Sequence, residues 1–254
     1  MTAALLEVAG LSVRFGGLRA VDDVSFAIGK NEIVGLIGPN GAGKTTIFNT
    51  LCGVIRASAG RVTFAERDVT GLAPERMAEL GVARTFQNVR LFGELSLREN
   101  VMMGAYRAGS CGLFAAMLRL GRHRRLEREA ARRADAWLGR LGLTAYAATK
   151  ATALPFGLQR VAEIARAMAS EPQLVLLDEP AAGLNEVEKH ELAHILRDIV
   201  RETACSALLV EHNMPLVMGL VDRVVVLDFG RKIADGLPDQ VVRDPAVVEA
   251  YLGA

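Results

Sequence analysis

The feature that most constrains the fold of this chain is a glycine-rich stretch that fits the pattern G-x-x-x-x-G-K-[ST], namely Gly38-Pro39-Asn40-Gly41-Ala42-Gly43-Lys44-Thr45-Thr46. An apolar segment of strand length, residues 32–37, precedes it, and residues 47–52 can continue it as a helix. A strand, a glycine-rich turn and a helix in this order surround one anion with backbone N–H groups and the positive end of a helix dipole. The stretch therefore predicts an α/β fold in which residues 38–46 bind a nucleotide triphosphate.

The residue types in this stretch suit that task. Glycines at positions 38, 41 and 43 allow backbone angles that side chains forbid, and they let the chain approach the phosphates closely. Lys44 can reach the β- and γ-phosphates, and the Thr45 hydroxyl can ligate Mg²⁺. A chance match on an ordinary glycine turn is the alternative, and the flanking strand and helix argue against it.

Composition limits the classes of protein to which the chain can belong. Its 254 residues can bury one large core or two small ones. No uncharged apolar run approaches the roughly 18 residues needed to span a bilayer, and the N-terminus lacks the features of a signal peptide. The net charge of +1 gives no support for a nucleic-acid partner, and Cys52, Cys111 and Cys205 are spaced as reduced thiols would be. We therefore expect a cytosolic protein whose role at a membrane is peripheral.

Short β-like segments are expected on both sides of the glycine-rich stretch. Turn residues at 10, 16–17 and 22–23 separate three segments before it, and a fourth segment follows it: residues 5–8, 11–15, 24–28 and 60–64. Alternation broken by glycine and aspartate predicts a small antiparallel sheet.

The second half of the chain predicts helices and a buried sheet. From about residue 96 to 169 the pattern is helical and rich in Ala, Leu and Arg, which indicates a helical insert. Continuous β-branched runs return at residues 174–178, 207–210 and 224–227. Such runs, separated by helices, are typical of strands buried on both faces of an α/β sheet.

Two carboxylates, Asp178 and Glu179, end the first of these runs. Ligands of open α/β sheets bind beyond the carboxyl ends of the strands, so both side chains are expected near the phosphates. We predict that Asp178 holds the Mg²⁺ shell and that Glu179 polarises the attacking water as general base. A solvated strand end is the alternative reading of such a sequence taken alone.

With these motifs the chain resembles the ATP-binding cassette (ABC) ATPases over nearly its whole length. The resemblance implies a P-loop NTPase (RecA-like) mixed-sheet core, an N-terminal antiparallel β subdomain and a helical subdomain inserted at roughly residues 93–165 of a single domain, 1–254. Phe15 matches the aromatic residue that stacks on adenine, although a core Phe fits equally well. Gln87 matches the glutamine that contacts Mg²⁺ and water, and His212 matches the switch histidine that binds the γ-phosphate.

The implied activity is hydrolysis of ATP, with ATP and Mg²⁺ as cofactors. The implied catalytic residues are Lys44, Gln87, Glu179 and His212. The implied Mg²⁺ ligands are Thr45, Gln87 and Asp178.

Residues 154–160, Leu-Pro-Phe-Gly-Leu-Gln-Arg, take the place of the family signature LSGGQ. Pro155 replaces the serine whose hydroxyl would bind the γ-phosphate, and it removes one backbone donor. Leu158 replaces the glutamine. Gly157 and the amides at the start of the following helix remain as an anion site. We therefore predict that Pro155, Phe156 and Gly157 contact nucleotide and that hydrolysis is retained but slower.

In this family the signature of one subunit completes the phosphate site of another. The resemblance implies a head-to-tail ATP sandwich dimer with a second ATPase chain, identical or related. Residues 181–185 would cross between the two sites, with Asn185 where an aspartate is usual. Transmembrane permease subunits and, indirectly, a solute-binding protein are further implied partners, at the cytoplasmic side of the bacterial inner membrane. No nucleic-acid partner is implied.

Several segments resemble one branch of this family, the ATPases of branched-chain amino acid importers: residues 85–92, 154–157, 181–185, 211–214 and 248–253. Relatives that import urea, amides or other small solutes share much of this pattern. They remain alternatives, as does a soluble cassette that acts as a scaffold. The arginine-rich stretch 119–133 is either a solvated helix face or a segment near anionic lipid headgroups.

Two short motifs point elsewhere. His190-Glu191-Leu192-Ala193-His194 fits the zinc-protease pattern H-E-x-x-H, for which Glu202 or Glu211 would have to supply a third ligand. Asp228-Phe229-Gly230 mimics a kinase magnesium motif without its catalytic loop. We interpret the first as a charged helix face, with a zinc metalloprotease as a remote alternative, and the second as a strand-to-turn boundary.

Overall fold

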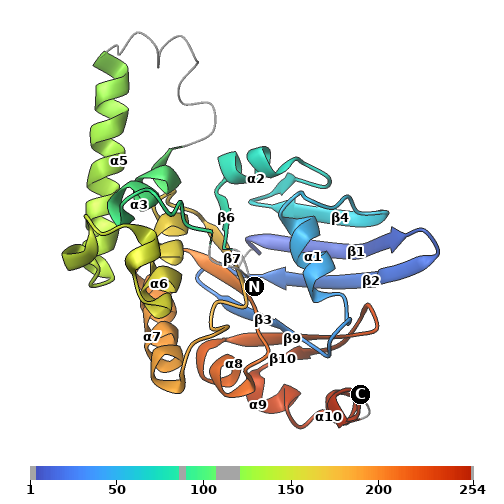
Figure 1. Cartoon of the computed structure of the whole chain (residues 1–254). Helices are drawn as coiled ribbons and strands as arrows, with labels where there is room; N and C mark the ends of the chain where they lie inside the picture. The colour runs from blue at the N-terminus through green and yellow to red at the C-terminus, as the bar shows by residue number, and fades with distance from the viewer. Residues whose placement is uncertain (1–3, 86–89, 107–120, 253–254) are drawn as a thin grey trace.

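The computed structural model describes residues 4–85, 90–106 and 121–252. It contains two β-sheets, with helices on both sides of the larger one (Figure 1). The smaller sheet has strand order β2-β1-β4-β5, and the larger has order β10-β9-β3-β8-β7-β6. Across the described ranges, no helix has the length and apolar character needed to cross a membrane.

The smaller sheet is antiparallel, as predicted, but its strands are longer than expected. Its members are β1 (Leu6–Phe15), β2 (Leu18–Ile28), β4 (Ala59–Phe64) and β5 (Arg67–Asp68). The predicted break at Gly10 was wrong, because the residue adopts φ +61° inside β1 and the pairing register shifts there. Asp23, with φ 56°, is likewise accommodated within β2. An irregularity in a strand thus resembles a turn in the sequence.

The larger sheet contains the predicted buried runs. Its strands are β3 (Ile33–Ile37), β6 (Val82–Arg84), β7 (Leu174–Asp178), β8 (Ser206–Val210), β9 (Arg223–Asp228) and β10 (Arg231–Gly236). Every residue of β3, β7 and β8 is buried, and neighbouring strands are parallel except for β10. The carboxyl ends of β3, β8 and β7 therefore meet at one edge of the sheet, where ligands of such sheets bind.

Within the described residues, three helices and two 3₁₀ turns lie between β6 and β7 along the chain. The helices are α3 (Leu97–Ala105), α5 (Gly121–Arg140) and α6 (Phe156–Met168), and the turns are Thr144–Tyr146 and Ala151–Ala153. The remaining helices are α1 (Lys44–Leu51), α2 (Pro74–Leu80), α7 (Glu186–Thr203), α8 (Met214–Leu220), α9 (Pro238–Val241) and α10 (Pro245–Leu252). Both α3 and α7 begin at capping boxes, formed by Ser96 with Glu99 and by Asn185 with Glu188. These boxes satisfy backbone N–H groups that a helix start leaves open.

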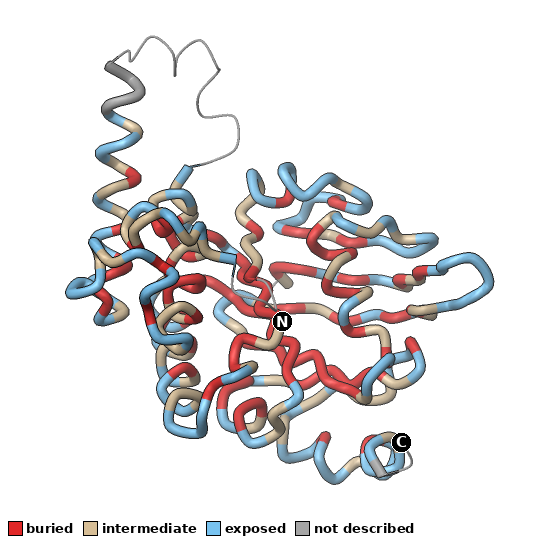
Figure 2. The backbone as a smooth tube through the Cα atoms, in the orientation of Figure 1, coloured by how far each residue is buried: buried red, intermediate tan, exposed pale blue. Residues whose placement is uncertain are grey.

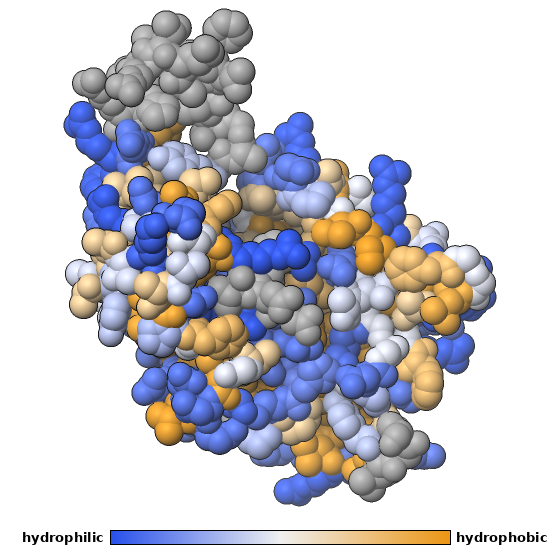
Figure 3. Space-filling model, in the orientation of Figure 1, coloured by the Kyte–Doolittle hydropathy of each residue, from blue (hydrophilic) through white to orange (hydrophobic). Residues whose placement is uncertain are grey.

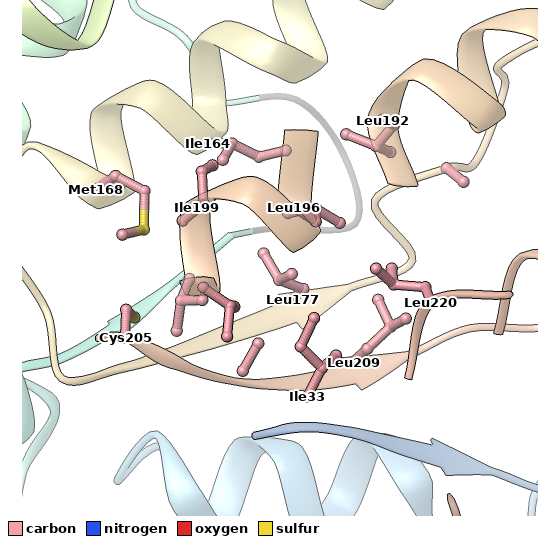
Figure 4. Close-up of a cluster of buried hydrophobic side chains, with 14 of the residues drawn as sticks. Ile33, Ile164, Met168, Leu177, Leu192, Leu196, Ile199, Cys205, Leu209 and Leu220 are labelled. Atoms are coloured by element: carbon pink, nitrogen blue, oxygen red, sulfur yellow. The ribbon is translucent and has the colours of Figure 1, made fainter. Parts of the chain in front are cut away.

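Two hydrophobic cores lie on opposite faces of the larger sheet. Successive strand residues point to opposite faces, so Val175 and Leu177 join the core under α6 and α7, whereas Leu174 and Leu176 join the core under α1 and the antiparallel sheet. Figure 2 shows buried backbone running through both layers, and Figure 4 shows Ile33, Leu177 and Leu209 of the sheet facing the helical side chains. The helices bearing residues 44 and 156 are thus held on different faces.

Candidate active site

The glycine-rich loop follows β3 directly and leads into α1. Gly38 and Gly43 have φ +148° and +100°, and a Cβ on them would lie 2.1 Å from the Leu227 carbonyl oxygen and 2.5 Å from that of Ala20. Only glycine fits between these neighbouring strands. Helix α1 has no side-chain cap and no acidic residue in its first turn. Its first N–H groups are therefore available to an anion.

Lys44 is buried at the start of α1, with 5% of its surface exposed. Its Nζ donates hydrogen bonds to the carbonyl oxygens of Gly38 and Pro39, at 2.7 and 2.8 Å. Burial lowers the pKa of Lys44, and the negative charge of Glu179 works in the opposite direction. The lysine is thus held inside the loop and within electrostatic range of the predicted base.

Asp178 ends β7 and is buried. Burial is the largest cause that raises the pKa of its carboxyl, and the charge of Glu179 adds to it; Arg84 is the strongest of the cations that lower it. The Asp178 backbone N–H donates to Thr85 Oγ1 at 3.4 Å. A carboxylate taken out of water in this way is stabilised by a nearby cation.

The structure brings the predicted base and the predicted switch histidine into contact. Glu179 Oε1 lies 2.8 Å from His212 Nε2, across the ends of β7 and β8. Glu179 has φ 46°, a conformation unusual for a residue with a side chain, and its N–H donates to the Val210 carbonyl at 2.9 Å. The sharp turn after β7 aims the carboxylate at the histidine.

Glu211 is a buried residue whose structural role we did not predict, since its sequence context suggested only a third zinc ligand. Its Oε1 accepts from the Ala181 N–H at 2.8 Å, and its Oε2 accepts from the His212 N–H at 3.1 Å. The side chain therefore ties the crossing segment, residues 181–185, to the turn that carries His212. The only signal in the sequence is an acid directly after the apolar run 207–210.

Arg84, at the end of β6, is a second residue that the sequence did not reveal. Its Nη1 donates to Asn49 Oδ1 at 3.2 Å, and its guanidinium lies 5.1 Å from the centre of the Phe48 ring. Both of these partner residues belong to α1. It is also the largest cause opposing the raised pKa of Asp178. Arg84 thus connects the helix after the phosphate loop to the strand end that carries the predicted Mg²⁺ ligand.

The signature residues lie at the start of α6, away from α1. Pro155 is the N-cap and supplies no side-chain acceptor. Phe156 packs on the crossing segment, because a Cβ on Gly183 would lie 2.8 Å from its ring; a Cβ on Gly157 would lie 2.6 Å from Glu188 Oε1. The guanidinium of Arg160 lies 5.3 Å from the centre of the Phe156 ring. These contacts join the signature to the crossing segment.

Four other predicted site residues are exposed. Phe15 is 50% exposed at the β1–β2 turn, while Ala20 of β2 contacts the phosphate loop through its carbonyl. Asn40, Gly41 and Thr45 are exposed on the loop and the first turn of α1. Gln87 lies outside the described residues.

The two misleading motifs have ordinary structural settings. His190 and His194 stack edge-on at 4.7 Å on α7, and nowhere in the described chain do three or more His, Cys, Asp or Glu residues gather as metal ligands would. Phe229 and Gly230 have φ 40° and 79° in the turn between β9 and β10, where Phe229 is 87% exposed. The strand-to-turn interpretation of residues 228–230 is therefore confirmed.

Comparison with known proteins gives consistent matches. The ABC transporter family profile matches residues 21–182, and a profile described as branched-chain amino acid ATP-binding cassette transporter matches residues 231–254. The high-affinity branched-chain amino acid transport ATP-binding protein LivG of Salmonella typhimurium is 45% identical over 253 residues, covering 100% of this chain and 99% of the relative. The corresponding protein BraF of Pseudomonas aeruginosa is 42% identical with the same coverage.

Two solved structures of ATP-binding cassettes from ABC transporters have the same fold. One is nucleotide-free and one is in the ADP conformation. Each has a TM-score of 0.87 and 29% identity, and the alignments cover 99% and 100% of this chain and the whole of each neighbour.

Proposed function

Because this chain belongs to the ABC transporter family, whose cassettes bind ATP and couple its hydrolysis to transport, we propose that it powers the import of branched-chain or other hydrophobic amino acids. The observation that carries the catalytic part is the 2.8 Å contact between Glu179 and His212 at the sheet edge that also holds the phosphate loop. The solute class rests on the C-terminal profile and on the names of the LivG and BraF relatives.

In the proposed mechanism, residues 38–46 bind the triphosphate with backbone N–H groups and the start of α1. Lys44 exchanges the carbonyls of Gly38 and Pro39 for the β- and γ-phosphates. Glu179 orients and polarises the attacking water, and His212 holds that carboxylate in place and contacts the γ-phosphate. Adenine stacks on Phe15 at the β1–β2 turn.

The residues also fit a magnesium ion. Thr45 offers a hydroxyl at the exposed start of α1, and the buried carboxylate of Asp178 is a hard oxygen donor that a cation would stabilise. Gln87 is proposed as a further ligand. The ion would neutralise phosphate charge when bound.

A second ATPase chain, identical or related, is proposed to complete the site. Phe156 and Gly157 contact residues 183 and 188, and α6 and α1 pack on opposite faces of the sheet. Pro155, Phe156 and Gly157 therefore suit the phosphate site of a facing chain better than the site of their own. The crossing segment would carry a change at one site to the other.

Permease subunits are proposed to bind an apolar groove between α2, β6, α3 and α6. The groove has a volume of about 660 Å³, and Met77, Phe92, Met103 and Tyr106 line it. Phe92, Met103 and Tyr106 are 52%, 45% and 38% exposed, an apolar surface that a partner segment would cover. Arg84 lines the same groove, so an inserted segment would lie close to Asp178 and α1. With permease subunits as partners, we propose that the chain works at the cytoplasmic face of the membrane, where ATP is present.

The test is a pull-down from detergent-solubilised membranes, followed by reconstitution of the recovered complex with its solute-binding protein in vesicles. We expect two permease chains, ATP-dependent uptake of leucine and no uptake by the Glu179→Gln complex. Uptake of urea or an amide in place of leucine would correct the solute. Recovery of ribosomes or DNA instead of permeases would favour a scaffold.

A further inference from the structure

Helix α5 presents a cluster of arginines to one cavity. Its 20 residues give a rod of about 30 Å. Arg125, Arg128 and Arg132 recur at spacings of three and four, so they share one helix face. A cavity of about 650 Å³ is lined by Arg98, Arg125, Arg128, Ala131, Arg132 and Asp135. We call Arg125, Arg128 and Arg132 the α5 arginine cluster.

The nearby carboxylates already have partners. Asp135 accepts two hydrogen bonds from Arg98, at 2.6 and 2.7 Å, and Glu129 pairs with Arg133 at 2.6 Å. Among the residues that the structure describes, Arg125, Arg128 and Arg132 form no ion pair, and all three are exposed. Like charges at these spacings destabilise a helix unless an anion is present. The whole chain has a net charge of only +1, so this cationic surface is local.

Helix α3 lines both the arginine-lined cavity and the proposed permease groove. It supplies Arg98 to the cavity and Met103 to the groove, less than two turns apart along its axis and on different faces of the helix. Figure 1 shows that α5 extends past α3, away from the larger sheet, and Figure 3 shows hydrophilic side chains on the coloured part of this edge of the molecule. If the groove holds a permease segment, as the proposed function requires, this side faces the bilayer.

We propose that the α5 arginine cluster binds the phosphate groups of anionic phospholipids. A planar guanidinium donates two parallel hydrogen bonds to phosphate oxygens, and several together suit a layer of headgroups. Each arginine near an anionic surface contributes roughly fivefold to affinity, so three together contribute roughly 100-fold. The contact would orient the cassette under its permease.

The test uses the full chain and vesicles of phosphatidylcholine with or without phosphatidylglycerol, and sedimentation measures the bound fraction. We expect the chain to bind the anionic vesicles only, and the variant R125Q/R128Q/R132Q to bind them roughly 100-fold more weakly. The matched control R67Q/R201Q/R243Q removes the same charge from exposed arginines on other elements and should retain most of the binding. High salt should release the wild-type chain.

Equal binding by the two triple variants, or binding to neutral vesicles, would overturn the proposal. Inorganic phosphate alone is the second probe: saturable binding that the cluster variant loses, without any affinity for anionic vesicles, would assign the cluster to a soluble anion instead. ATP binding and permease pull-down are measured on the same samples. If the wild-type chain fails to bind ATP or to recover permease, the result counts against the proposed function. If it binds ATP and permease but not the vesicles, the result counts only against the lipid site.

Discussion

At the scale of single residues, the proposed catalysis depends on the 2.8 Å contact between Glu179 and His212. Changing Glu179 to Gln keeps the shape and the hydrogen bond but removes the proton acceptor. We expect ATP turnover to fall roughly 10²- to 10⁴-fold while ATP binding is retained, which traps the closed dimer. Steady-state hydrolysis and size-exclusion chromatography with ATP measure the two effects. Full turnover in this variant would remove Glu179 from the role of base.

The phosphate loop depends on glycine in two different ways, and Gly41 and Gly43 separate them. Both have positive φ, but a Cβ on Gly41 meets nothing within 4 Å, whereas one on Gly43 meets the Ala20 carbonyl oxygen at 2.5 Å. Gly41→Ala should lower the free energy of unfolding by about 1 kcal/mol through backbone strain. Gly43→Ala should lower it further and abolish ATP binding. Urea unfolding and nucleotide titration measure both, and equal effects would mean that the clash is relieved.

Arg84 is predicted to keep Asp178, the proposed Mg²⁺ ligand, in its charged form. Arg84→Gln leaves Asn49 without its charged partner and should lower the free energy of unfolding by about 1–3 kcal/mol. It also removes the strongest cause that lowers the pKa of Asp178, so that pKa rises further. A larger fraction of Asp178 is then protonated at a given pH, and the acid limb of the ATPase profile should move to higher pH.

Arg84→Lys is the matched control, because it keeps the charge and loses the planar contact with Phe48. A pH profile that shifts equally in the Lys and Gln variants would show that packing, rather than charge, is the role of Arg84.

The residues found from the sequence and those missed differ in how their contacts arise. Lys44 belongs to the glycine-rich motif, Asp178 and Glu179 end an apolar run, and His212 was identified through the family resemblance, so each is marked by its local sequence. Arg84 acts on residues 35 and 94 positions away, and nothing local marks it. Such contacts follow from packing, which a single sequence does not display.

At the scale of elements, the altered signature changes how helix α6 begins. Pro155 caps the helix without a hydroxyl. Pro155→Ser supplies an N-cap acceptor and should raise the free energy of unfolding by about 1 kcal/mol relative to Pro155→Ala. In the assembled dimer the serine should also raise turnover, because its hydroxyl can bind the phosphate of the facing site. Unchanged nucleotide affinity and turnover in the assembled complex would show that Pro155 has no catalytic consequence.

The strand predictions at this scale were accurate where burial is complete and wrong where strands bend. The apolar runs predicted as strands were confirmed as β7, β8 and β9. A strand buried on both faces requires a continuous apolar run, which is easily recognised in the sequence. The segments around Gly10 were split too finely, because glycine permits an irregular strand as readily as a turn.

At the scale of the whole molecule, the two cores hold α1 and α6 on different faces of one sheet, an arrangement that fits the two half-sites we propose for one chain. Periodicity predicted the strands buried on both faces of a sheet, and the family resemblance implied the mixed-sheet core with its helical insert. They did not predict the apolar groove or the arginine-lined cavity, because both form only when α3 packs beside its neighbours.

The groove provides the prediction that belongs to the molecule as a whole. Met103→Glu places a carboxylate on the surface where a permease segment would be buried, and an unpaired buried charge opposes association strongly. Val242→Glu, at 49% exposure compared with 45% for Met103, makes the same chemical change on the segment after α9. We expect Met103→Glu to lose permease in the pull-down while both variants bind ATP like the wild type. If both variants keep the permease, or both lose it, the groove is not where the permease binds, and the link from Arg84 to an inserted segment has to be abandoned with it.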